Sequence, residues 1–136
     1  MDDATRKQAM AEYLDLHKQW IESGGHKGER LSLAGALLIG ADFRDANLGK
    51  ADFGKANLDR ASFHEATIQN GEFVNTAMHH ARFIESQLEG ANFHQSNMAN
   101  VDLRTARLPG AILSKSSFRG VELPDLSYAI KPSLAR

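Results

Sequence analysis

A large apolar residue returns every five residues along most of this chain of 136 residues. The segment ADFRDANLGKADFGKANLDR, residues 41–60, shows the unit: alanine, a small polar residue, Phe or Leu, and two residues that are mostly polar. We call the large apolar residue the centre of the unit, and alanine stands two residues before it in eleven of twenty units. The twenty centres share one unbroken frame: Leu33, Leu38, Phe43, Leu48, Phe53, Leu58, Phe63, Ile68, Phe73, Met78, Phe83, Leu88, Phe93, Met98, Leu103, Leu108, Leu113, Phe118, Leu123 and Tyr128.

This five-residue period fits neither a helix nor a straight strand. On an α-helix, residues five apart are rotated by about 140°, which spreads the centres around the whole circumference. In a straight strand, an odd spacing places successive centres on opposite faces. If the chain turns a corner every five residues, each short segment directs its centre and its alanine inward. The position two after the centre is Gly, Asn or Asp in ten of twenty units, which suits such corners. The pattern therefore predicts a coil.

The phenylalanines indicate that the coil has four sides. From Phe43 to Phe93 a phenylalanine recurs every ten residues and alternates with Leu, Ile or Met. A square coil of twenty residues stacks Phe53, Phe73 and Phe93 on one side and the intervening phenylalanines on the opposite side. A coil of ten residues has only two short sides, which cannot enclose such side chains. We therefore expect an all-β solenoid with a quadrilateral cross-section.

The repeated units ADFRD, ANLGK, ADFGK, ANLDR and ANFHQ resemble those of the pentapeptide-repeat proteins. The resemblance covers residues 31–130 and implies a right-handed quadrilateral β-helix of about five coils. The segment LHKQWIESGGHKGERLSLAGA is similar to the lead-in that precedes the repeats in many bacterial members. We predict three regions: a helix and connector at 1–30, the β-helix at 31–130 and a tail at 131–136.

An amphipathic helix is predicted over residues 4–23, with Asp3 as its N-cap and Gly24 and Gly25 as its stop. A solenoid leaves an open core and unpaired edges at each end, so this helix is expected to cap the first coil. The alternative is a helix that docks on a partner. Its apolar stripe consists of Met10, Tyr13, Leu14, His17 and Ile21, widened by Leu16 and Trp20.

The opposite end is also apolar, and two prolines there resist regular structure. It either folds over itself or is buried against a second copy of the chain, which would make a homodimer. Related pentapeptide-repeat proteins dimerise through their C-terminal ends, so the resemblance favours the dimer. The residues predicted to form this contact are Leu123, Leu126, Tyr128, Ile130 and Leu134.

Composition excludes several classes of function. A formal charge of −1 gives no attraction to nucleic acid or to an anionic membrane, and the chain has no cysteine. No apolar run approaches the length of about 20 residues that spans a bilayer, and the first residues lack the apolar stretch of a signal peptide. We therefore expect a cytoplasmic protein that binds neither nucleic acid directly nor membrane.

No motif for catalysis or for a cofactor stands out. Stacking places His79 beside Asp59 of the preceding coil, but a metal site needs three or four converging ligands. The segment GGHKGER lacks the spacing that cradles a phosphate. A flat rod also offers no desolvated pocket in which carboxylate pKa values would be tuned. We predict no catalytic residue, no metal and no cofactor, and thus a protein that is not an enzyme.

One side of the predicted rod is rich in acid. It is the side centred on Phe43, Phe63, Phe83, Leu103 and Leu123, and three arginines oppose its seven acidic residues. Glu65 and Glu85 are placed in one column with Asp45, one coil apart, where like charges are mildly unfavourable. The side is either an ordinary solvated surface or an interaction face. Its acidic residues are Asp42, Asp45, Glu65, Glu85, Asp102, Glu122 and Asp125.

Two functions follow. The first is a non-enzymatic scaffold, a rigid rod whose flat sides bind a protein partner that the sequence does not identify. The second comes from the resemblance: some pentapeptide-repeat proteins are dimeric DNA mimics that bind DNA gyrase, a type II topoisomerase. This chain departs from those members because its net charge is nearly zero and its frame contains no inserted loop. The scaffold is therefore the leading hypothesis, and the DNA mimic is the alternative.

Overall fold

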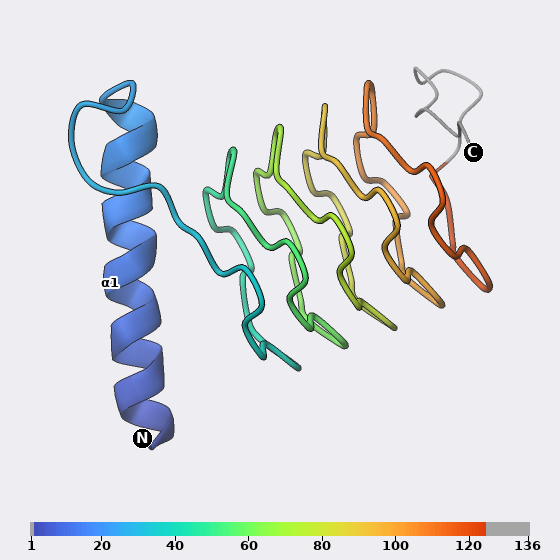
Figure 1. The fold of residues 1–136 in the computed structure, drawn as a ribbon, viewed down its shortest axis with the longest axis horizontal. Helices are drawn as coiled ribbons and strands as arrows, with labels where there is room; N and C mark the ends of the chain where they lie inside the picture. The colour runs from blue at the N-terminus through green and yellow to red at the C-terminus, as the bar shows by residue number, and fades with distance from the viewer. Residues whose placement is uncertain (1, 125–136) are drawn as a thin grey trace.

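The computed structural model describes residues 2–124 of the chain. One α-helix, α1 (Asp3–Glu22), stands across the end of a stack of coils that begins near residue 31 (Figure 1). Among the described residues there is no continuous strand, because each side of a coil contributes a single bridging residue. A helical region thus precedes a region of coils, and the predicted boundary at residue 130 lies outside the described residues.

Parallel bridges join residues that are twenty apart, from Ser32 with Asp52 to Asp102 with Glu122. The bridging residue is always the one before a centre, so four bridges hold each coil to the next. Backbone hydrogen bonds support every side; the amide of Phe53, for example, donates to the carbonyl of Glu72 (2.7 Å). The predicted coil of twenty residues with four sides is confirmed. The predicted number of about five coils stays a prediction, because residues 125–130 are not described.

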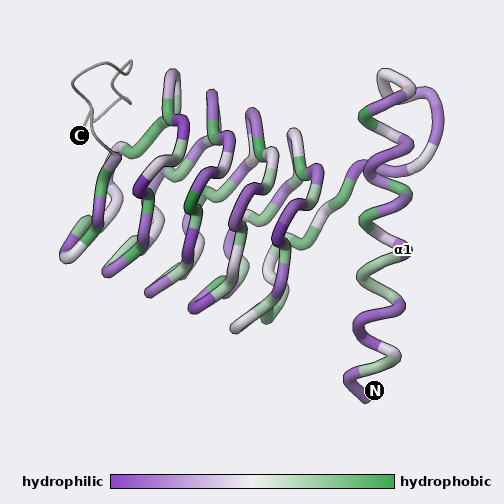
Figure 2. Tube along the Cα trace, turned by 180° about the vertical axis from the view of Figure 1, so that it is seen from behind, coloured by the Kyte–Doolittle hydropathy of each residue, from purple (hydrophilic) through white to green (hydrophobic). Residues whose placement is uncertain are grey.

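Aromatic rings form the middle of the core. Phe63 stacks on Phe43 with ring centroids 5.1 Å apart and on Phe83 at 4.7 Å, and Phe73 does the same with Phe53 and Phe93 on the opposite side. Rings of the two columns meet edge to face at 5.5–5.9 Å, an arrangement that aromatic quadrupoles favour. Figure 2 shows hydrophobic and hydrophilic residues alternating along each coil. The alanines and centres expected inside are buried along most of the rod.

The corners of the coil all have the same backbone conformation. Every residue two after a centre, from Gly35 to Gly120, has a positive φ between 57° and 73°, and thirteen of these residues are not glycine. The left-handed region costs a residue with a side chain about 1 kcal/mol or more. At Lys55 or Arg60, the bridges on both sides of the corner therefore impose the turn on the backbone.

Helix α1 lies against the first coil through a stripe that differs in part from the expected one. Met10 and Leu14 pack on the core and His17 is fully buried, whereas Tyr13 is 52% exposed. The predicted N-cap is wrong by one residue. The cap is Asp2, whose Oδ1 accepts the amide of Thr5 at 2.7 Å, and this hydrogen bond lowers the pKa of the Asp2 carboxyl.

The connector between α1 and the coil returns along the helix after the turn at Gly24 and Gly25. Gly28 passes so close that a Cβ atom there would lie 2.1 Å from the carbonyl oxygen of Leu16. The amide of Glu29 then donates to that same carbonyl at 3.0 Å. The expected cap is thus seen as a helix held on the first coil.

Within residues 2–124, no helix is both long and apolar enough to cross a membrane. The cytoplasmic location stays a prediction.

Candidate interaction face

The side of the coil centred on Phe43, Phe63, Phe83 and Leu103, which we call the acidic face, carries the predicted acidic residues. Six of the seven lie within the described residues, and Asp125 lies outside them. Three acidic residues occupy bridging positions before a centre, and three occupy corners. The coil thus brings together on one face residues that are twenty positions apart in sequence.

Arginines neutralise the acids at the bridging positions. Arg44 binds Asp42 through two hydrogen bonds of 2.9 Å, from Nε to Oδ1 and from Nη2 to Oδ2. Arg104 binds Asp102 in the same way, with its Nη2 at 2.8 Å from Oδ2, and its Nε also lies 3.3 Å from Glu122. These hydrogen bonds lower the pKa values of the Asp42 and Asp102 carboxyls. Sequence counting places the three arginines on this side, but which acids they bind depends on side-chain conformations that the pattern does not specify.

The acids at the corners remain without a basic partner of this kind. Asp45, Glu65 and Glu85, which we call the acidic column, follow one another along one edge of the acidic face, and all three are exposed. Hydrogen bonds with Asp45 and Glu85 favour the protonated form of the central carboxyl and raise the pKa of Glu65. The predicted column is therefore present, and its carboxylates are close enough to influence one another.

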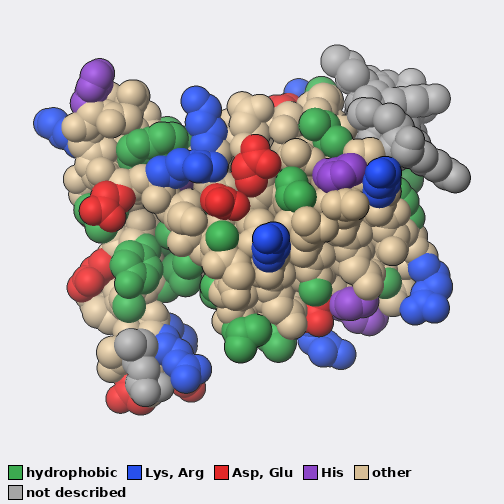
Figure 3. Space-filling model, in the orientation of Figure 1, with side chains coloured by type: hydrophobic (Ala, Val, Ile, Leu, Met, Phe, Trp, Pro, Cys, Tyr) green, Lys and Arg blue, Asp and Glu red, His purple; other side chains and the backbone are tan. Residues whose placement is uncertain are grey.

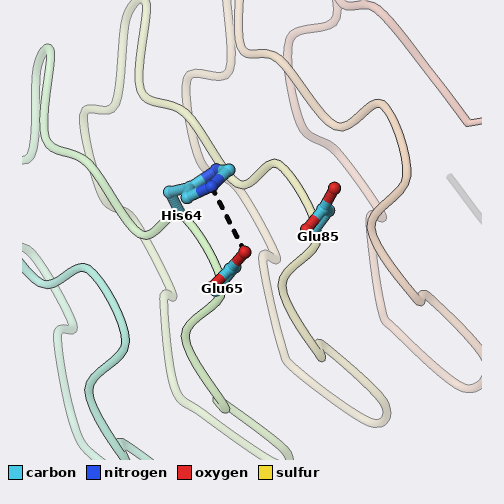
Figure 4. A group of neighbouring side chains, drawn as sticks. All are labelled: His64, Glu65 and Glu85. Carbon is cyan, nitrogen blue, oxygen red and sulfur yellow. Dashed lines mark ion pairs between the residues drawn. The ribbon is translucent and has the colours of Figure 1, made fainter.

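His64 places a ring nitrogen beside the acidic column. This neighbour was not predicted from the sequence. Its Nε2 lies 3.6 Å from Oε1 of Glu65, and Glu85 projects from the next coil toward the same space (Figure 4). One ligand atom from each of these three residues lies within 4.8 Å of the other two. The signal was in the sequence, because His64 directly precedes Glu65 and Glu85 follows twenty residues later.

Chemically, a nitrogen and two carboxylates are a ligand set that suits several divalent metals. In this cluster, however, both glutamates are exposed and His64 is half-buried. No buried group among the described residues fixes any of the three in one orientation. The cluster is thus a group of largely exposed side chains at the edge of the acidic face. The pair singled out from the sequence is also present: Nδ1 of His79 lies 2.9 Å from Oδ1 of Asp59.

The rest of the described surface is of mixed charge. Arg60 and Arg82 line a shallow, open depression on the acidic face, together with Asp42 and Arg44. In Figure 3, acidic, basic and histidine side chains are interspersed on the visible face of the coils. Among the described residues of the acidic face, the carboxylates without an arginine partner are therefore those of the acidic column.

The predicted C-terminal contact is described only in part. Leu123 is 44% exposed, and Leu126, Tyr128, Ile130 and Leu134 lie outside the described residues. The apolar surface that the pattern did not predict is at the other end of the coil, where Leu37 is 82% exposed and Ile39 61%. Both flank a centre of the first coil.

Comparison with known families gives one match over the coil. The sequence model described as pentapeptide repeats, with 8 copies, matches residues 30–64, 56–95 and 86–123. No curated protein is similar enough to the chain to indicate a relationship.

Solved structures of similar shape include two with a TM-score above 0.5. A trypsin-treated form of QnrB1, a plasmid-mediated fluoroquinolone resistance protein, has a TM-score of 0.59 and 18% identity; the alignment covers 65% of this chain and 44% of QnrB1. A pentapeptide repeat protein of the Arabidopsis thaliana thylakoid lumen has a TM-score of 0.53 and 26% identity, covering 71% of this chain and 68% of its own. This chain thus spans less than half of the QnrB1 structure. The matches imply that the coil is a right-handed quadrilateral β-helix.

Proposed function

Since the chain belongs to the pentapeptide-repeat family, we propose that it is a non-enzymatic scaffold that binds a protein partner through its acidic face. The observation that carries the proposal is the acidic column. Asp45, Glu65 and Glu85 are exposed at one edge of a rigid coil and are close enough to raise the pKa of Glu65. Crowded like charges destabilise a free surface, and a partner that brings basic side chains would remove that penalty.

The shape of the described surface supports a scaffold over an enzyme. The depressions on the acidic face are shallow and open, and exposed polar and charged side chains line them. Catalytic sites are usually concave and largely apolar, with a few converging polar groups. A flat face of fixed side chains is suited instead to contact with another protein surface.

The alternative, a DNA mimic that binds DNA gyrase, finds less support in the charge distribution. A protein that replaces duplex DNA needs a long run of negative charge, because a duplex carries one charge about every 1.7 Å of its axis. Among the described residues of the acidic face, Arg44 and Arg104 neutralise the bridging acids and leave the acidic column. The likeness to QnrB1, at 18% identity, concerns the fold alone.

The proposal predicts that neutralising the acidic column weakens partner binding. In affinity capture from the native host with quantitative mass spectrometry, we expect Glu65→Gln with Glu85→Gln to reduce recovery of the specific partner about tenfold, equivalent to about 1.4 kcal/mol. Captured wild-type complexes should also dissociate as salt rises, because exposed charges are screened. The thermal midpoint should stay equal or rise, because the substitutions remove repulsion from Glu65.

A matched control double variant removes two negative charges outside the acidic column. Glu12→Gln with Glu72→Gln changes an exposed helical residue and a residue on the opposite side of the coil, and it should capture the partner as the wild type does. Equal losses with both double variants would contradict the assignment to the acidic face.

Purified wild-type protein should not inhibit DNA supercoiling by gyrase at micromolar concentration. Inhibition that Glu65→Gln with Glu85→Gln abolishes would favour the DNA mimic.

We further propose that the chain forms a homodimer through its C-terminal end. In support, Phe118 and Val121 are only partly buried, whereas the equivalent residues one coil earlier, Met98 and Val101, are fully buried. Leu126→Arg combined with Tyr128→Asp should give a folded monomer in analytical ultracentrifugation. The interface is expected near the lower size limit of stable contacts. A wild-type protein that sediments as a monomer at roughly tens of micromolar would refute the dimer.

A further inference from the structure

His17 is the buried polar side chain that joins α1 to the coil. The residue is 0% exposed, and both of its ring nitrogens contact backbone groups outside α1. Nε2 lies 2.8 Å from the carbonyl oxygen of Gly49, and the amide of Leu31 lies 2.8 Å from Nδ1. On α1 itself, the indole of Trp20 stacks on the imidazole with centroids 5.6 Å apart.

These two contacts fix the protonation state of the ring. A backbone amide can only donate, so Nδ1 must offer its lone pair to the amide of Leu31. A carbonyl can only accept, so Nε2 must carry the hydrogen and donate it to Gly49. The geometry thus requires a neutral imidazole in one tautomer, with each nitrogen in a defined role.

The hydrogen bond from His17 to the Gly49 carbonyl takes the place of a backbone hydrogen bond between two coils. One coil later, the equivalent carbonyl of Gln69 accepts the amide of Lys50 at 2.9 Å. The first coil has no preceding coil to supply such an amide to Gly49. His17 supplies the missing donor, so it covers an edge that would otherwise be unpaired.

We propose that His17 is a proton-operated latch: its neutral imidazole fastens α1 to the first coil, and protonation of the ring releases the helix from that end of the rod. A protonated ring carries a hydrogen on Nδ1, which would face the amide hydrogen of Leu31. One bond becomes a repulsive contact between two donors, and a positive charge is left without water.

The surroundings of the ring set the pH range of the latch. Burial lowers the pKa of His17, the hydrogen bond to the Gly49 carbonyl opposes this effect, and the positive charge of Arg30 lowers the pKa further. The groups that face the ring are Trp20 from α1, Arg30 and the Leu31 amide from the connector, and the Gly49 carbonyl from the coil.

The pH dependence then has a definite sign. The folded pKa of His17 lies below the ordinary histidine value of about 6.5, so the released state binds the proton more tightly. The latch is fully engaged above pH 6.5 and weakens as the pH falls toward the lowered pKa. In that interval, uptake of one proton favours release about tenfold per pH unit.

Release would uncover a second surface, separate from the acidic face. The edge groups of Gly49 and Leu31 would lose their partners, and the apolar surface on which Met10 and Leu14 pack would become accessible. Leu33 and Leu38 of the first coil are only partly buried even with α1 in place. The inference is independent of the proposed partner binding, because no residue of the acidic column contacts the latch.

Hydrogen exchange on the full chain tests the latch. Between pH 8 and pH 5, after correction for intrinsic exchange, we expect the protection of α1 amides to fall about tenfold per pH unit below 6.5. Protection of the coil residues around Phe63 and Phe73 should stay constant. Nitrogen NMR should show the Nε2-protonated tautomer at pH 8 and a midpoint below 6.5, and the only tryptophan, Trp20, reports the same event by fluorescence.

Two variants separate the latch from a general effect of acid. His17→Gln keeps a donor and an acceptor but cannot gain a proton, so its helix protection should not change over this range. His26→Gln, an exposed histidine in the connector, should respond as the wild type does. The proposal is overturned if His17→Gln retains the acid response, if α1 and the coil lose protection together, or if His17 titrates at or above 6.5 while α1 stays protected.

Discussion

Replacing Phe73 by alanine is expected to lower the free energy of unfolding by about 3–5 kcal/mol. Phe73 is fully buried, and its ring stacks on those of Phe53 at 5.1 Å and Phe93 at 4.7 Å. The substitution removes a ring from the middle of a closed column. The surrounding coils cannot collapse into the cavity, because backbone bridges fix their spacing. Urea denaturation monitored by circular dichroism measures the loss.

The neighbouring residue provides the control. Val74 is next in sequence but points outward and is only half-buried. Val74→Ala should cost no more than about 1 kcal/mol, as expected for a substitution away from the core. If Phe73→Ala and Val74→Ala cost the same, the aromatic columns do not stabilise the rod as described.

Inserting one residue after Asn70 is expected to prevent folding of the coil beyond that point. All parallel bridges join residues twenty apart, so a shift of one residue breaks those that cross the insertion, such as the bridge between Ser62 and Arg82. The later centres also move out of the inward positions, as in a strand whose register slips. Loss of the cooperative thermal transition, together with hydrogen exchange in residues 71–124, would report this outcome.

An insertion of five residues, such as a second copy of ANLGK, should do much less harm at the same site. It preserves the inward position of every centre and turns the following sides by one quarter of the coil. The aromatic columns would then be interrupted, because Phe73 would stack on Leu58 and Phe83 on Ile68. We expect a folded protein of lower stability, and equal damage from both insertions would contradict a unit of five residues.

The interior of the coil could be predicted almost completely from the sequence. The centres and alanines are buried because one inward position recurs every five residues, and no regular element other than a coil accommodates that spacing. Phe43 stacking on Phe63 follows from the same arithmetic. The ends were harder to predict. The pattern stops there, and only local signals such as Asp2 and Asp3 remain to place the cap.

The corners show where local propensity failed as a guide. The abundance of Gly, Asn and Asp predicted unusual backbone angles at about half of them, yet Lys50, Glu65 and even Thr105 adopt the same positive φ. The hydrogen-bonded sides enforce the corner geometry, so tertiary structure overrides the preference of the single residue. Thr105 is β-branched, and its hydroxyl accepts the amide of Glu85 at 2.9 Å, a bond that helps to hold this corner.

The features that carry the scaffold and latch proposals depended on contacts that a pattern does not encode. The sequence placed His17 in an apolar stripe, and nothing nearby indicates that its partners are Leu31 and Gly49, which are 14 and 32 residues away. Likewise, the total charge of the acidic face was predictable, but its division into paired acids and an acidic column was not. Pairing depends on short-range geometry, such as Arg44 reaching back by two residues to Asp42.

The twenty-residue register also determines how a partner can recognise this protein. Asp45, Glu65 and Glu85 come from three successive coils, and the residues between them in sequence lie on the other three sides. The acidic column is therefore a discontinuous epitope that exists only while the rod is folded. A linear peptide cut from this chain presents one of the three carboxylates in any short stretch, so it cannot compete with the intact protein. Recognition of the column would thereby report that the chain is folded.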